Sequence, residues 1–95
     1  MTTKRLKSYR YLRSSLEVCT DEKRRKHLTQ EMNEITSWVH SIDDPLAVRV
    51  FEERYLAMQN ARDIKLCPWW KVASRLHYSE SRVKHIHSIV INAQR

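Results

Sequence analysis

Apolar residues between positions 69 and 90 repeat with helical spacing on either side of a short break. The first set follows the i, i+3, i+4, i+7 spacing of one buried helix face and comprises Trp69, Val72, Ala73 and Leu76. The second set follows i, i+3, i+7 spacing and comprises Val83, Ile86 and Val90. Ser79 lies in the break, where its hydroxyl can cap the second helix. The pattern predicts two short helices joined by a tight turn.

The second of these helices, placed at about residues 80–91, turns polar side chains away from its apolar stripe. The outward-facing residues are Glu80, Ser81, Lys84, His85 and Ser88, with Arg82 and His87 at the flanks. A short cationic helix supported by a small apolar partner is the layout of a helix-turn-helix that enters the DNA major groove. A plain helical hairpin in an all-α core fits the same spacing, so the spacing leaves both interpretations open.

The first forty residues carry two further apolar stripes that are out of register with each other. One comprises Tyr9, Leu12, Leu16 and Cys19, flanked by Leu6, with basic residues including Arg10 on the other faces. The other comprises Leu28, Met32, Ile35 and Val39. Thr20 or Asp21 can cap a new helix between them. The pattern favours an antiparallel helical hairpin with a bend near Thr20, and a single long helix in a dimeric coiled coil is the alternative.

A third helix start is marked by Asp44 and Pro45, because Asp suits the cap and Pro suits the first helical position. Its apolar positions are Leu46, Val50, Phe51 and Tyr55, and the pattern can extend to Met58. Residues 59–67 show no period and are expected to form a loop, after which Pro68 opens the next helix.

Composition supports an all-α fold, because the 95 residues include no Gly and only two Pro. Hairpin turns and phosphate-binding loops depend on Gly, which argues against a β-rich protein, a P-loop and a dinucleotide-binding fold. We therefore expect an N-terminal basic helical hairpin at 1–42, followed by a three-helix helix-turn-helix module at 43–95.

The net positive charge of the chain limits the kinds of molecule that are expected to bind it. The chain has 18 Lys and Arg against 11 Asp and Glu, a net charge of +7, and residues 71–95 hold five basic groups and one acidic group. Such a surface suits a polyanion, either nucleic acid or an anionic membrane. No apolar run approaches the roughly 20 residues that cross a bilayer, and no signal peptide is visible. Two cysteines form no disulfide framework, so we expect a cytoplasmic protein with reduced thiols.

Residues 44–92 resemble the fourth region of bacterial sigma factors and, more closely, the small phage transcriptional regulators of the RinA and ArpU type. The likeness is carried by Arg49-Val50-Phe51-Glu52-Glu53-Arg54-Tyr55-Leu56, by Trp69-Trp70-Lys71-Val72-Ala73, and by Leu76-His77-Tyr78-Ser79-Glu80-Ser81-Arg82-Val83-Lys84-His85-Ile86. It implies binding to double-stranded DNA and control of phage late or packaging genes. It also implies base contacts by Glu80, Ser81, Lys84 and His85, and phosphate contacts by Arg75, Arg82 and Ser88.

Two features depart from this family. The stretch between Tyr55 and Trp69 is longer than the usual short turn, and His77 replaces the Gly that the family prefers. That turn position needs a positive φ, which costs a His on the order of 1 kcal/mol. We therefore expect a strained turn at His77 and an altered connection before Trp69.

Several partners are compatible with these patterns. Besides DNA, the protein could contact RNA polymerase or another host protein, and the N-terminal stripes could form a homodimer. The alternatives in function are a protein that binds and modulates a host protein through its helical surface, and a DNA-recognition subunit of a phage packaging machine. Trp69 is expected in the core, whereas Trp70 either packs under the 59–67 loop or marks a protein contact.

The sequence offers little support for catalysis, and we expect neither an enzyme nor a cofactor. It contains no HExxH, GxSxG or Cys-x-x-Cys motif. His85 and His87 point about 200° apart on a helix and cannot share a metal. Cys67 and His77 are interpreted as a buried thiol and a turn residue rather than as a nucleophile pair.

Overall fold

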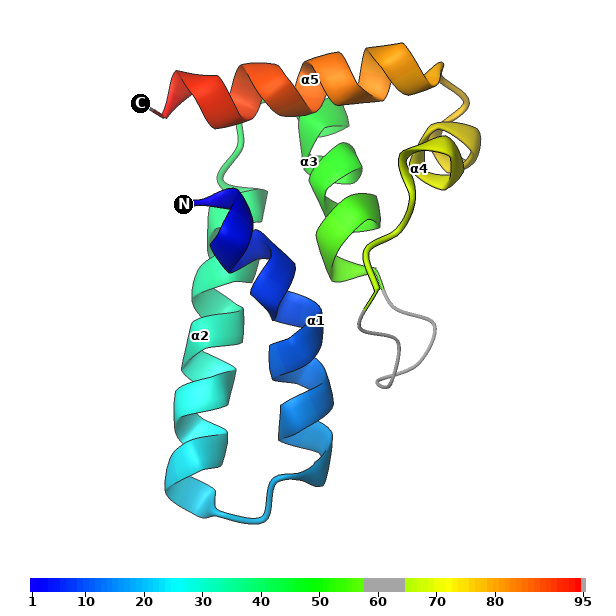
Figure 1. Cartoon of the computed structure of the whole chain (residues 1–95). Coiled ribbons are helices and arrows are strands. Elements are labelled where there is room, and N and C mark those ends of the chain that lie inside the picture. The colour runs from blue at the N-terminus through cyan, green and yellow to red at the C-terminus, as the bar shows by residue number, and fades with distance from the viewer. Residues whose placement is uncertain (58–64, 95) are drawn as a thin grey trace.

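The computed structural model describes residues 1–57 and 65–94 and shows an all-α protein, with no strand among these residues (Figure 1). The predicted fold class is confirmed. No helix in this part of the chain is both long enough and apolar enough to cross a membrane. The elements are α1 (Thr3–Val18), α2 (Glu22–His40), α3 (Pro45–Phe51), η1 (Glu52–Leu56), α4 (Trp69–Leu76) and α5 (Glu80–Ala93).

The first two helices form the predicted antiparallel hairpin, and α1 ends before Thr20 instead of continuing as one long helix (Figure 1). Asp21 caps α2, its carboxylate accepting a hydrogen bond from the Lys23 backbone N–H at 3.1 Å. The Arg25 guanidinium donates to the carbonyls of Leu16 and Cys19, each at 2.9 Å. The last carbonyls of a helix lack partners within it. By donating to these carbonyls at the end of α1, the Arg25 side chain of α2 stabilises the bend between the two helices.

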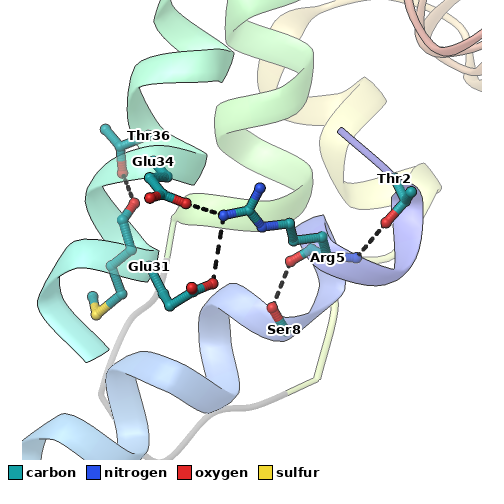
Figure 2. Close-up of polar contacts among 7 residues, drawn as sticks. Thr2, Arg5, Ser8, Glu31, Glu34 and Thr36 are labelled. Carbon is teal, nitrogen blue, oxygen red and sulfur yellow. Dashed lines mark hydrogen bonds and ion pairs between the residues drawn. The ribbon is translucent and has the colours of Figure 1, made fainter. Parts of the chain in front are cut away.

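Ion pairs link the two helices of the hairpin nearer its open end. Figure 2 shows Arg5 of α1 reaching Glu31 and Glu34 on α2, with the Arg5–Glu31 pair at 3.5 Å. Thr2 caps α1 by accepting from the Arg5 backbone N–H at 3.1 Å. These groups are partly exposed, so each ion pair contributes at most about 1 kcal/mol and mainly sets the register of the two helices.

The third helix begins as predicted, with the Asp44 carboxylate accepting from the Leu46 N–H at 3.0 Å and Pro45 in its first turn. It then widens into the π-helical turn η1, where the Ala57 N–H donates to the Glu52 carbonyl at 2.7 Å. The possible continuation to Met58, and most of the predicted 59–67 loop, lie outside the described residues.

Two clusters of buried side chains hold the helices together. One lies within the second half of the chain and comprises Ala47, Val50, Cys67, Val72, Ala73, Leu76, Val83 and Ile86. The other joins the hairpin to α3 and η1 and comprises Leu6, Ile35, Val39, Phe51 and Tyr55. Through this second cluster the N-terminal hairpin packs directly on the helices that support α5.

The buried face of α1 differs from the predicted heptad stripe. Leu6 is fully buried, whereas Tyr9, Leu12, Leu16 and Cys19 are only half-buried. Arg10, expected on an outward face, is 2% exposed, and its guanidinium donates to the Arg54 carbonyl at 3.4 Å. Tyr9 and Leu12 still pack against the second cluster. The outward placement of Arg10 was wrong, because α1 packs on η1 as well as on α2.

Candidate nucleic-acid interface

The connection between α4 and α5 is a tight turn built from two local signals. The Tyr78 N–H donates to the Ala73 carbonyl at 3.0 Å and the His77 N–H to Ser74 at 3.3 Å, the hydrogen-bond pair of a Schellman ending. His77 takes the left-handed conformation, with φ 62° and ψ 38°. Ser79 then caps α5 by accepting from the Arg82 N–H at 3.2 Å. The positive φ at His77 and the Ser79 cap, both predicted from sequence, are confirmed.

One face of α5 is anchored in the core. Val83 is fully buried and Ile86 nearly so, and both pack with Val72 and Leu76 of α4 and Val50 of α3. Figure 1 shows α5 lying across the end of α3, with α4 beside its N-terminal end. Burying side chains of this size stabilises a contact by roughly 1.5–3 kcal/mol each, so α5 is held as a rigid element.

The opposite face of α5 is open to solvent and is not covered by the N-terminal hairpin. Its exposed residues include every residue of α5 that the sequence placed at the site: Glu80, Ser81, Arg82, Lys84, His85 and Ser88. Arg75, at the end of α4, is exposed as well. The side chain of Ile89 is also 55% exposed on this helix, an apolar addition that the sequence interpretation did not include.

Two of the cationic side chains at this face already have acidic partners. Lys84 lies 3.5 Å from Glu80, one turn earlier on α5. Arg75 donates to the Glu53 carboxylate of η1 at 3.0 Å, which directs its guanidinium toward η1. Exposed pairs of this kind contribute at most about 1 kcal/mol, so a phosphate can replace either carboxylate at small cost.

Within α5, the sequence placed His87 wrongly. Expected at the flank of the exposed face, its ring instead stacks on Phe51, with centroids 4.8 Å apart, and shares a 2.6 Å hydrogen bond with the Tyr55 hydroxyl. Burial, and after it the charges of Arg54 and Lys7, lower the pKa of His87 to about 4. The signal was present in the sequence, because His87 occupies the i+4 position of the stripe that begins at Val83.

The two tryptophans of α4 have different surroundings. Trp69 is half-buried against the core, as predicted, and the Arg54 guanidinium carbon lies 4.3 Å from its ring centroid. Trp70 is 63% exposed. The predicted contact between Trp70 and the 59–67 segment falls largely on residues outside the described part of the chain.

Cys67 is buried and His77 is exposed in the turn, as their interpretation as structural residues required. Within residues 1–57 and 65–94, no group of three His, Cys, Asp or Glu side chains is arranged to hold a metal ion.

Comparison with known proteins gives no relative: no protein-family model, no curated protein and no solved structure matches the chain.

Proposed function

We propose that the chain is a sequence-specific double-stranded DNA-binding protein, and a transcriptional regulator of the small phage type, with α5 as its recognition helix. The observation that carries the proposal is the open face of α5, where Ser81, Lys84 and His85 project from a helix whose other face is fixed by Val83 and Ile86. A rigid helix with an exposed polar side is what insertion into a major groove requires. The net charge of +7 suits the polyanion.

In the proposed complex the N-terminal part of α5 enters the major groove. Lys84 and His85 donate to guanine O6 and N7, and Glu80 accepts from a cytosine amino group once Lys84 has left it. Arg82, Ser88 and Arg75 bind phosphates and fix the register on the duplex. Arg75 must exchange Glu53 for a phosphate, so its contribution to affinity is the smallest of the three.

The test is a gel-shift assay with fragments of the parent genome at two salt concentrations, using wild type, Lys84→Gln and Lys23→Gln. Lys23 is exposed at the hairpin end, which lies opposite α5 (Figure 1), so it serves as a charge-matched control. We expect Lys84→Gln to weaken binding to the best fragment about fivefold to tenfold, because a base or phosphate contact of roughly 1 kcal/mol or more is lost. Lys23→Gln should bind like wild type.

Equal affinities for the two variants would remove α5 from the interface. Absence of a shift with any fragment would end the DNA proposal and favour a protein that modulates a host protein, such as RNA polymerase. The mass in solution separates a regulator, which we propose to be a monomer or dimer in the host cytosol, from a packaging subunit, which would form a ring of eight or nine copies.

A further inference from the structure

A pocket of about 340 Å³ lies between the start of α1 and the side of α5. Lys7 and Thr3 line it from α1, Arg54 and Tyr55 from η1, and Lys84 and Ser88 from α5. Trp69 of α4 and His87 of α5 complete the lining, so the walls come from four helical segments, α1, η1, α4 and α5. None of these segments alone would indicate a site.

The pocket is cationic. Lys7, Arg54 and Lys84 supply three positive charges, and no acidic side chain is among its described lining residues. Outside the lining, the exposed carboxylate of Glu80 lies 3.5 Å from Lys84. Like charges gathered around one cavity repel each other and are relieved when an anion enters. The charge of Lys7 also reaches the neighbouring His87 ring strongly enough to contribute to its lowered pKa, after burial and Arg54.

Arg54 is fixed in place before any ligand binds. Its guanidinium lies over the Trp69 ring at 4.3 Å and donates to the Cys67 carbonyl at 2.6 Å. Its Nε is buried and has no hydrogen-bond partner among the residues that the structure describes. Buried donors are nearly always satisfied. Because this guanidinium is already held, it loses little side-chain entropy on binding an anion.

The pocket adjoins the proposed DNA-binding face. Lys84 and Ser88 are one turn apart on α5, and both line the pocket while remaining exposed on the open face. A helix is about 10–12 Å across and the major groove about 12 Å wide. The sides of an inserted helix therefore lie close to the phosphates that border the groove.

We propose that this pocket receives a backbone phosphate of the bound duplex, with Lys7 and Arg54 as cationic ligands beside Lys84, so that the N-terminal hairpin is part of the DNA interface. The inference rests on the proposed function and adds two residues to it. Lys7 contacts only the phosphate, so its contribution is independent of base sequence. Lys84 lies between the pocket and the open face of α5, where it can reach either the phosphate or a base.

The experiment compares Lys7→Gln with Lys23→Gln, two exposed helix-surface lysines whose loss leaves the core intact, in salt titrations of duplex binding. We expect Lys7→Gln to weaken specific and non-specific duplexes by the same factor, about fivefold, and to reduce the slope of log K against log salt by about 1. Lys23→Gln should change neither quantity. Circular dichroism of both variants checks that the helices remain.

A second arm locates the contact on the DNA. Single methylphosphonates, which remove one backbone charge, are placed along the best fragment. At one position the substitution should weaken wild type more than Lys7→Gln does, because Arg54 and Lys84 lose the same phosphate charge. It should weaken Lys7→Gln by a smaller factor than wild type, because a double-mutant cycle detects a shared contact. Binding of inorganic phosphate, followed by the NMR shifts of the Lys7 and His87 side chains, tests the pocket without DNA.

The outcomes separate the two proposals. If Lys84→Gln weakens binding while Lys7→Gln behaves like Lys23→Gln, the inference is overturned and the recognition role of α5 stands. Inorganic phosphate in the pocket together with an unaffected duplex affinity of Lys7→Gln would make it a site for a free phosphate compound, which also overturns the inference. If wild type shifts no duplex, both proposals fall.

Discussion

The turn at His77 offers a quantitative test of the fold, because the substitution His77→Gly should stabilise the protein. His77 is the one residue in the described part of the chain with a positive φ that is not glycine. The left-handed conformation costs an L-residue roughly 1–2 kcal/mol, and His lies at the lower end of this range. The side chain is exposed, so its removal costs little packing.

The gain is partly offset in the unfolded state. Glycine has more freedom to lose on folding, which costs about 0.4–1 kcal/mol relative to a residue with a Cβ. The net expectation is a stabilisation of about 0.5 kcal/mol. For a domain of this size, 1 kcal/mol corresponds to a Tm change of about 4–8 °C, so we expect Tm to rise by about 2–4 °C in a thermal melt followed by circular dichroism.

The control for this prediction is Ser74→Gly, an exposed position within α4. There a glycine is in a regular helix and should lower stability by roughly 0.5 kcal/mol. His77→Ala, which retains the Cβ and lacks the polar ring, should also be less stable than wild type. If His77→Gly melts below wild type, the strain assigned to this turn does not exist and the stability of the α4–α5 connection has another source.

Two further predictions concern α5. The folded protein holds the pKa of His87 at about 4, below the usual 6.5, so between these two pH values the unfolded chain binds a proton that the folded protein does not. The stability of the fold is therefore retained above pH 6.5 and is lost as the pH falls from 6.5 to 4. The loss is on the order of 2 kcal/mol after allowance for the partial exposure of His87. Urea unfolding at pH 7 and pH 4.5 should show this loss of stability in wild type and in the control His85→Gln, and a smaller loss in His87→Gln. An equal loss in all three proteins would contradict the assignment of the pH dependence to His87. Ser79→Ala should lower stability by about 1 kcal/mol through loss of the α5 cap, whereas Ser81→Ala should stay within about 0.5 kcal/mol; similar melts for both would show that the cap contributes nothing.

The local signals in the sequence were sufficient for most of the helix boundaries. Asp21, Asp44 and Ser79 each cap the helix that follows, because a short side-chain oxygen satisfies the unpaired N–H groups of a first turn whatever the rest of the fold is. The exposed face of α5 was also predictable, since Val83 and Ile86 define the buried side and the other positions follow from the helical period.

The remaining features depend on contacts between distant segments. Arg10 is buried, although a single sequence gives no reason for α1 to pack against η1. The π-helical turn at Glu52–Leu56 also has no signature in the apolar spacing. Lys7 belongs to a pocket with Lys84 only because the chain brings its two ends together, with the Met1 amino group donating to the Gln94 side chain at 3.0 Å.

The placement of the aromatic side chains connects the two halves of the proposed interface. Phe51 packs with Leu6 and Ile35 of the hairpin and also stacks on His87 of α5. A shift of the hairpin would therefore disturb the stack between Phe51 and His87. A neutral His87 suits this position, because a charged ring would add to Lys7 and Arg54 and repel both. With the His87 ring neutral, the positive charge of the pocket comes from Lys7, Arg54 and Lys84, the three residues that we propose to contact the phosphate.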